Sequence, residues 1–350
     1  MSFDWLSDRI KSPDTTLLEQ ARQRQQQLTK PPGSLGQLED LACRLSAMQG
    51  RPRPRLEKIQ ISVFAADHGV VEEGVSAFPQ SVTVEMLRNF SAGGAAISVL
   101  AQELGANLEV INCGTVTDPG EMLGVINKRI CAGSANMCKS SALSSNQLVE
   151  ALLLGRELVE IYTVRGIDLF IAGEMGIGNT TSAAAIACAL LNKPAAVLTG
   201  PGTGLDEDGV RHKTRIIERA LQLHNLPVDN PKQILQCLGG FEIAAMTGAY
   251  IAAAQAGIPI LVDGFISSVA ALLATRLQPD CHKWMILAHV SAEPGHVYIV
   301  DALQLQPLLN LGMRLGEGSG AAMAVPLLRN SCALHNRMAT FAEAHVSDQI

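Results

Sequence analysis

The stretch LFIAGEMGIGNTTSAAAIACALL, which runs from Leu169 to Leu191, contains the whole repeating unit of the fold. Its first residues form a continuous apolar run, its middle is rich in glycine, and its last ten residues are mostly small and apolar. A strand that is buried on both faces carries such a run, without the alternation of a half-exposed strand. The stretch therefore predicts a buried strand at Leu169–Gly173, a tight turn, and a helix that begins at Ser182.

Similar units recur along the chain and predict the remaining elements of a sheet. Five further apolar runs predict strands at Ile59–Ala65, Leu108–Asn112, Ala195–Thr199, Ile258–Val262 and Trp284–His289. The clearest helices are predicted at Val149–Tyr162, Ser182–Leu191, Asp206–Leu223, Phe241–Ala256 and Ser267–Leu277. Alternation of strand and helix is typical of a doubly wound parallel sheet. We therefore expect an α/β fold with a doubly wound, mostly parallel sheet of six strands.

The two ends of the chain depart from this pattern. Helices are predicted at Asp14–Gln27 and Gln37–Met48, and the proline-rich segment Arg51–Arg55 reads as a linker because it cannot hold a helix. The C-terminal segment 320–344 is predicted to be mostly helical, with Pro326 either kinking a helix or starting a new one. We expect residues 1–50 and 320–350 to form a small helical domain beside a large α/β domain, residues 56–319, that holds the active site.

Composition and charge exclude several classes of protein. Of the 350 residues, 47% are apolar and 17% charged, and the net charge is −6. No basic patch rich in aromatics is present, which argues against a nucleic-acid partner. The eight cysteines form no C-x-x-C pair and read as small core residues. The polar N-terminus and the lack of a long apolar stretch predict a soluble, cytoplasmic protein without a membrane partner.

Polar residues and glycines gather where the predicted strands end. In open α/β sheets, ligands bind at the carboxyl ends of the strands. If the strands are parallel, this edge collects three carboxylates, two histidines and two glycine-rich loops. The segments concerned are Asp67–Gly69, Asn112–Gly114, Gly173–Thr181, Gly200–Gly204, Asp263–Phe265 and His289–Ser291.

The segment after the third of these strands carries the strongest signal for phosphate. Gly176 and Gly178 would let an anion approach the backbone, and Asn179 and Thr180 supply donors just before a helix. Free N–H groups and a partial positive charge at helix starts favour phosphate. The alternative is an ordinary glycine-rich turn, because the segment lacks the lysine of a P-loop.

A second glycine-rich turn contains Gly202 and Gly204 and is equally ambiguous alone. Lys213 and Arg211 on the following helix could neutralise a phosphate. Their alternative is a solvated helix face.

The pair Asp67–His68 is a weak candidate for a metal site. No second carboxylate–histidine pair occurs at helical spacing, and no H-E-x-x-H is present. We expect His68 to have a structural role, with a bond to the backbone at the strand end, and His289 and His296 to be structural too. No metal and no other cofactor is predicted.

Glu317 is the most conspicuous carboxylate near the C-terminus. Gly316 and Gly318 flank it and free the backbone to place its side chain in an unusual direction. Apolar Leu315 and Met313 nearby would raise the pKa of the Glu317 carboxyl towards that of a usable base. The alternative is a surface glutamate in a loop before a helix.

Several short motifs, taken together and in order, resemble one enzyme family. They are K-P-P-G-S-L-G at 30–36, A-D-H-G-V at 66–70, P-Q-S-V-T at 79–83, G-G-A-A-I at 93–97, G-E-M-G-I-G-N-T-T at 173–181, G-P-G-T-G at 200–204, D-G-F at 263–265 and L-G-E-G-S-G-A at 315–321. The chain resembles the nicotinate-nucleotide:dimethylbenzimidazole phosphoribosyltransferases of cobalamin biosynthesis over nearly its whole length.

This resemblance implies a Rossmann-like domain, a homodimer and a reaction. The reaction transfers phosphoribose from nicotinate mononucleotide to 5,6-dimethylbenzimidazole with inversion, giving α-ribazole 5′-phosphate and nicotinate. The resemblance makes Glu317 the catalytic base. Glu174 and Asp263 are plausible acceptors for ribose hydroxyls or stabilisers of the developing ribosyl cation. Leu315 and Met175, with Gln80 on the segment Phe78–Met86, are expected to form the slot for the base.

Three other functions remain as alternatives. Another glycosyl-transferring or phosphosugar enzyme could use the same sheet, and a nucleotide sensor would bind without turnover. A nicotinamide-dependent oxidoreductase is disfavoured, because no G-x-G-x-x-G follows the first strand.

Overall fold

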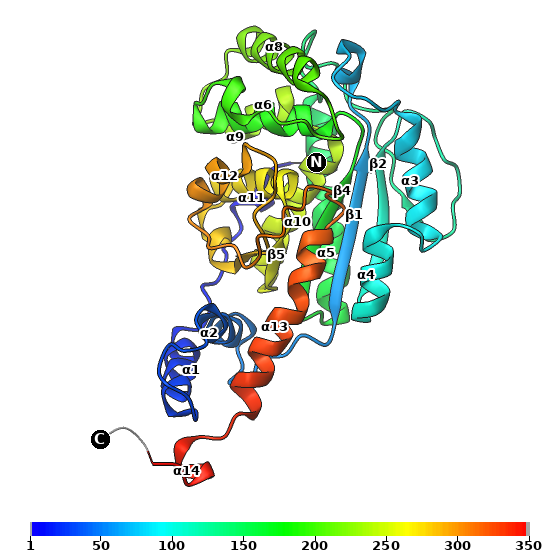
Figure 1. Ribbon diagram of the computed structural model, residues 1–350. Coiled ribbons are helices and arrows are strands. Elements are labelled where there is room, and N and C mark those ends of the chain that lie inside the picture. Colours follow the sequence, from blue (N-terminus) through cyan, green and yellow to red (C-terminus); the bar gives the residue numbers. More distant parts are fainter. Residues whose placement is uncertain (1, 348–350) are drawn as a thin grey trace.

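A single parallel sheet of six strands organises the computed structural model, which describes residues 2–347 (Figure 1). The strand order β3-β2-β1-β4-β5-β6 is that of the Rossmann fold. This confirms the predicted doubly wound sheet. The chain winds outwards from β1 on one side and from β4 on the other, so the switch point lies between these two strands. The strands are β1 (Ile59–Ala66), β2 (Asn107–Gly114), β3 (Val125–Asn127), β4 (Leu169–Met175), β5 (Ile260–Val262) and β6 (Met285–Leu287).

One of the six predicted strands is wrong, and one real strand was missed. Residues predicted as the strand Ala195–Thr199 form the helix α7 (Ala195–Leu198). Pro194 precedes it with φ near −60°, which suits a helix start, and the Thr199 hydroxyl donates back to the Ala195 carbonyl. The missing strand is β3, which pairs with β2 at the sheet edge and has no fully buried residue. It therefore lacks the apolar run by which the others were recognised.

Helices cover both faces of the sheet. On one face α10 packs on β1, β2 and β4, and α5 packs against α10. On the other, α3 contacts β1 and β2, α4 contacts β2, and α13 contacts β4 and α4. The elements of this region are η1 (Asp4–Ser7), η2 (Gly69–Glu73), α3 (Ser81–Ser91), α4 (Ala96–Leu104), α5 (Ser145–Arg165), α6 (Asn179–Leu191), α8 (Glu207–His224), α9 (Pro231–Leu238), α10 (Phe241–Ala256), α11 (Phe265–Leu277), η3 (Pro279–Trp284) and α12 (His296–Leu303).

The helices from the two termini lie together at one end of the molecule (Figure 1). They are α1 (Thr15–Gln27), α2 (Gln37–Gln49), α13 (Ser319–Arg337) and α14 (Phe341–Ala344). Helix α13 continues through Pro326, and its Ser331 hydroxyl donates to the Leu38 carbonyl at 2.6 Å. We propose that residues 1–50 and 320–350, of which 1 and 348–350 lie outside the described residues, form the small helical domain. The segment η1 is an exception, because the carbonyls of Trp5 and Leu6 accept hydrogen bonds from Gln255 and Gln278 of the large domain. Because α13 also packs on α4 and β4, one helix would then connect the two domains.

The cysteines lie mostly in the protein interior, as expected for small core residues. All eight cysteines are free, and only Cys131 and Cys138 are not fully buried. Within residues 2–347, no helix has both the length and the apolar character needed to cross a membrane.

A close contact between α5 and α10 predicts a site sensitive to a single methyl group. A Cβ added at Gly155 would overlap the Ala245 carbonyl oxygen and lie 2.6 Å from the Ala249 nitrogen. Gly155→Ala should therefore lower the free energy of unfolding by about 1–3 kcal/mol, measured by urea denaturation. Val164→Ala, on the exposed side of the same helix, serves as the control and should change it by less than about 0.5 kcal/mol. A Gly155→Ala variant as stable as the wild type would contradict this packing.

Candidate active site

A cavity of about 420 Å³ opens at the carboxyl ends of β4, β5 and β6. Its walls come from the turns after these strands, from the segment that follows β1, and from the residues that lead into α13. This is the edge at which the sequence predicted a site. Of the predicted site residues, the structure brings together in its lining Glu174, Met175, Gly176, Asn179, Thr180, Gly202, Asp263, Leu315 and Glu317.

Four predicted site residues lie outside this lining. The Lys213 ammonium is buried behind it and donates to the Thr180 hydroxyl at 2.7 Å and to the Gly200 carbonyl at 3.3 Å. Gln80 donates to the carbonyl of His68 at 3.0 Å, on the turn after β1. Gly204 has a φ of 112° and open space around it. The fourth residue is Gly178, which precedes α6.

Gly178 packs against protein and does not face the pocket. It precedes α6 with a φ of 95°, and a Cβ there would lie 2.7 Å from a methyl carbon of Val71 and 3.1 Å from the Cβ of His68. From the sequence, Gly178 was expected to let an anion approach the backbone. That expectation is wrong for this residue, because a side chain at Gly178 would press on η2 instead.

One side of the pocket gathers cations around the Gly202 loop, and we call it the cationic end: Thr180, Gly202, Lys213, Glu293 and Arg314. The Gly202 amide donates to Glu293 Oε1 at 3.0 Å, and its carbonyl accepts from Arg314 at 2.8 Å. Burial lowers the pKa of Lys213 to about 8, although the charge of Glu293 opposes this shift. With the start of α6 beside it, this end suits an anion that carries several oxygens.

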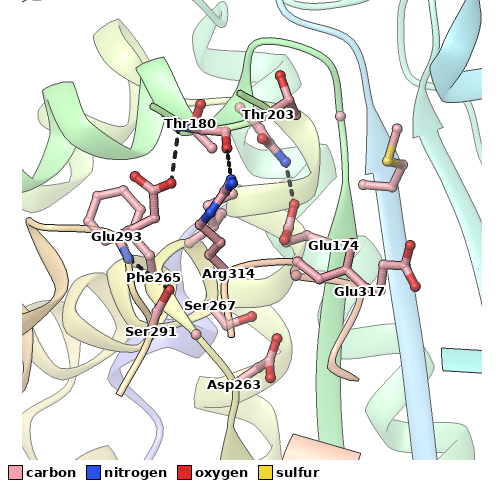
Figure 2. Close-up of a pocket in the computed structure, with 18 of the residues that line it drawn as sticks. Glu174, Thr180, Thr203, Asp263, Phe265, Ser267, Ser291, Glu293, Arg314 and Glu317 are labelled. Carbon is pink, nitrogen blue, oxygen red and sulfur yellow. Dashed lines mark hydrogen bonds between the residues drawn. The ribbon is translucent and has the colours of Figure 1, made fainter. Parts of the chain in front are cut away.

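Glu317 lies on the opposite side of the pocket from Glu293 in Figure 2. Its own φ is +64°, between Gly316 at +87° and Gly318 at +86°. The unusual backbone predicted from the flanking glycines is thus confirmed. Its side chain is buried, and one carboxylate oxygen accepts the amide of Ile97 at 3.3 Å. Burial raises the pKa of Glu317 above its ordinary value, and the Ile97 bond opposes this.

Glu174, at the end of β4, has a raised pKa. Burial first, and then the charges of Glu242 and Asp263, raise the pKa of Glu174 to about 8, while a hydrogen bond from Asn179 opposes the shift. Glu174 is therefore mainly protonated at neutral pH.

Asp263, at the end of β5, is held by backbone donors. One oxygen accepts the Gly318 amide at 3.2 Å, and the other accepts the Ala321 amide at 2.7 Å. The ring of His289 lies 3.5 Å from the second oxygen. Both oxygens are therefore engaged by the start of α13.

The histidines near the site have partners inside the protein. His68 pairs with the carboxylate of Glu242 at 2.6 Å, so the predicted bond to the backbone is wrong. His296 accepts from Ser291 and contacts the Ser268 hydroxyl, and burial lowers the pKa of His296 to about 4. Within the described part of the chain, no group of three or more histidine, cysteine, aspartate or glutamate residues could hold a metal ion.

Apolar side chains form a slot within the pocket. It is lined by Phe78, Val82, Met86, Met175 and Leu315. Phe78 and Leu315 are about half exposed, so they stand at the mouth. A flat apolar ring fits such a lining.

Sequence reasoning missed Glu293 and Arg314. The motif S-A-E-P-G at 291–295 follows the last strand of the sheet, so reading two residues further along that turn would have found Glu293. Arg314 directly precedes the glycine-rich motif at 315–321 that contains Glu317. Arg211, considered as a partner of Lys213, forms exposed ion pairs with Glu207 and Asp208 and belongs to the solvated helix face.

Comparisons with known proteins agree in one family. The family model described as "Phosphoribosyltransferase" matches residues 10–346. A protein of Pseudomonas putida strain W619 is 59% identical over 349 residues, which cover 100% of this chain and 99% of the relative. A protein of Pseudomonas aeruginosa strain PAO1 is 58% identical with the same coverage. Both are named nicotinate-nucleotide–dimethylbenzimidazole phosphoribosyltransferase.

Solved structures of similar chains come from Thermus thermophilus. One, described as CobT, has a TM-score of 0.92 and 43% identity, and the match covers 95% of this chain and 100% of that one. Another, described as the nicotinate-nucleotide–dimethylbenzimidazole phosphoribosyltransferase, has a TM-score of 0.91, 42% identity, and coverage of 96% and 100%.

The lowered pKa of Lys213 predicts how anion binding depends on pH. Lys213 is charged below a pH of about 8 and neutral above it, so the cationic end loses positive charge as the pH rises through this value. Sulfate is a suitable probe, because it does not titrate in this range. Its affinity, measured by calorimetry, should fall between pH 7 and pH 9. Glu174, whose pKa is also about 8, gains negative charge over the same range and contributes to the fall. Lys213→Met should therefore make the fall smaller, and Arg211→Met, on the solvated face, should leave it at its wild-type size. A sulfate affinity independent of pH in the wild type would contradict the assignment.

Proposed function

The chain belongs to the family of nicotinate-nucleotide–dimethylbenzimidazole phosphoribosyltransferases, and on this premise we propose how its pocket carries out the reaction. The enzyme transfers phosphoribose from nicotinate mononucleotide to 5,6-dimethylbenzimidazole. The products are α-ribazole 5′-phosphate and nicotinate, and the step serves the biosynthesis of cobalamin.

The proposed arrangement assigns one substrate group to each part of the pocket. The phosphate occupies the cationic end, near Lys213 and Arg314, and the benzimidazole occupies the apolar slot beside Glu317. The single observation that carries the proposal is the buried carboxylate of Glu317, which borders an apolar slot across the pocket from the cationic end. Holding both substrates in this orientation lowers the entropic part of the barrier.

The chemistry requires one base and no redox partner. The unprotonated nitrogen of the benzimidazole attacks C1′ while the bond from C1′ to the nicotinate nitrogen breaks. The electron pair of that bond remains on nicotinate, whose ring nitrogen becomes neutral, so no general acid is needed. The proton on the other benzimidazole nitrogen passes to Glu317. Because a β-nucleotide gives an α-product, the acceptor attacks from the face opposite the leaving group. This sequence calls for no metal and no other cofactor.

The remaining roles follow from the protonation states and the burial of the groups. Glu174, neutral at pH 7, adds no charge repulsion against an anionic nucleotide and can hydrogen-bond to a ribose hydroxyl. Met175 and Leu315 contact the base, and Gly176, Asn179 and Thr180 lie at the start of α6 nearest the phosphate.

A homodimer and a cytoplasmic location also belong to the proposal. The dimer is supported by large apolar side chains that are exposed. Phe78 and Leu315 line the pocket, Leu311 precedes α13, and Met323 lies in α13. The molar mass in solution, measured by light scattering, tests the dimer.

The proposed reaction is tested by the release of nicotinate. The purified protein mixed with nicotinate mononucleotide should release nicotinate only when an acceptor base is present. An apolar slot discriminates weakly between bases of similar shape, by roughly 1–3 kcal/mol per methylene-sized difference, so unsubstituted benzimidazole should also be accepted. Phosphate as the acceptor should give no product. Release that requires phosphate would favour another phosphosugar enzyme, and binding without any release would favour a sensor.

Glu317 and Glu174 should respond differently to the same substitution. Glu317→Gln removes the base and should lower kcat by about 10²–10⁴-fold. Glu174→Gln replaces a carboxyl group that is already neutral at pH 7, so kcat there should fall by less than about tenfold. Both variants should still bind nicotinate mononucleotide. Equal losses in the two variants, or a mild effect of Glu317→Gln, would contradict the division of roles.

A further inference from the structure

Glu317 has a backbone conformation that needs external support. A left-handed φ in a residue with a side chain costs roughly 1–2 kcal/mol, and it persists where the surroundings enforce it. The Ser319 hydroxyl closes the turn locally with a bond of 2.7 Å to the Gly316 carbonyl. Two further features, one on β4 and one at the end of β5, hold this turn from outside.

The first feature is the bare backbone of Gly173 in β4. A Cβ at Gly173 would overlap the carbonyl of Glu317 and lie 2.6 Å from the Gly318 nitrogen. The peptide that links Glu317 to Gly318 therefore lies directly on the strand, at the residue before Glu174. Any side chain at Gly173 would push this peptide off β4.

The second feature is the carboxylate of Asp263. It accepts the amides of Gly318 and Ala321, one on each oxygen, so it fixes both the residue after Glu317 and the first turn of α13. A negative charge at a helix start also interacts favourably with the helix dipole. The side chain is almost completely buried, so these bonds are shielded from water.

We propose that Asp263 is a positioning residue, which acts on the reaction by holding Glu317 in its left-handed conformation against Gly173. This positioning role takes the place of the role as an acceptor for ribose hydroxyls that the sequence suggested for Asp263. The inference rests on the proposed function, in which Glu317 is the base. Asp263 then influences the chemical step through Glu317, and the nucleotide does not need to contact it.

Asp263 also influences the charge state of the base. The groups that face Glu317 are Glu174 on β4, Asp263 after β5 and His289 after β6, together with the Ile97 amide from α4. After burial, the charge of Asp263 is a further cause that raises the pKa of Glu317. Glu317 works as a base when it is deprotonated, so activity rises with pH through its pKa. Removing the charge of Asp263 should therefore shift this rise to lower pH.

The test is Asp263→Asn, assayed by nicotinate release across pH. An asparagine presents one oxygen and one N–H₂ group, so one of the two backbone amides would face a donor. We expect kcat to fall by about 10–100-fold and KM for nicotinate mononucleotide to change by only a few-fold. The acid limb of the kcat profile should move to lower pH. A raised KM with an unmoved limb would show that Asp263 binds the ribose, and would overturn the proposal.

Asp168→Asn is the matched control. Asp168 is equally buried at the start of β4, where one of its oxygens accepts the amides of Glu57 and Lys58 at 3.1 and 3.0 Å. An asparagine can keep both of these bonds with its side-chain oxygen, so the variant loses mainly the negative charge that pairs with Arg51 and Arg55. This change lies at the amino end of β4, away from the pocket. It should lower stability while leaving kcat and its pH profile unchanged. A similar loss of kcat in Asp168→Asn would show that the loss in Asp263→Asn comes from general destabilisation, and would contradict the proposal.

Gly173→Ala provides a second variant that alters the same peptide without removing a charge. This variant should lower kcat with little change in KM. The acid limb of its kcat profile should stay in place, because the charge of Asp263 is retained. Gly155→Ala, which crowds α5 against α10, controls for the loss of stability. If Gly173→Ala keeps wild-type kcat, the support of Glu317 by β4 is refuted. If the wild-type protein releases no nicotinate, the proposed function is wrong. If the wild type is active and Glu317→Gln is inactive, but Asp263→Asn has normal activity, only this inference is wrong.

Discussion

The contact between the Gly316–Gly318 turn and the bare backbone of β4 is the constraint on which the site depends. A turn of three successive left-handed residues can lie flat on a strand only where the strand has no side chain, and Gly173 provides that place. The contact brings Gly316, the residue before Glu317, against Glu174, since a Cβ at Gly316 would overlap the Glu174 carboxyl group. It also determines where α13 begins. Helix α13 also packs against α2 and contacts α1, so the position of the base is connected to the packing of both chain ends.

Electrostatic asymmetry distinguishes the two ends of the pocket. The cationic end holds Lys213 and Arg314, whereas the other end holds three carboxyl groups within a buried region. If all three were charged, their mutual repulsion would be costly in this environment. The protein reduces this cost in two ways. Glu174 is mainly protonated at neutral pH, and Asp263 receives two backbone N–H groups. Glu317 is then the carboxylate available to accept a proton.

The sequence predicted the elements that carry a strong local signal. The buried strands β1 and β4 and the helices α5 and α10 have long apolar patterns, and they were found within a few residues of their ends. Residues 195–198 were misassigned, because a run of four apolar residues suits a strand or a short helix equally. Strand β3 exists through its pairing with β2, and its three residues have no pattern of their own.

The site was predictable where position on the sheet edge or a pair of glycines revealed it, as for Glu174, Asp263 and Glu317. Tertiary contacts decided the rest. Lys213 and Arg211 lie two positions apart on α8, yet one is buried behind the pocket and the other is exposed. Gly178 was expected to face a ligand and instead packs on Val71. Whether such a residue faces the pocket, the interior or the solvent depends on which element packs against it, and the local sequence pattern does not predict that packing.

Chemical rescue tests most directly whether a carboxylate held in this turn accepts the proton of the benzimidazole. Glu317→Gly suits the experiment, because glycine tolerates the left-handed φ and leaves a space where the side chain was. We expect this variant to release almost no nicotinate alone, and added formate or acetate to restore release in a saturable manner. Glu174→Gly should not be rescued in this way. If small carboxylates fail to rescue Glu317→Gly while nicotinate mononucleotide still binds, or if they rescue Glu174→Gly instead, Glu317 is not the base.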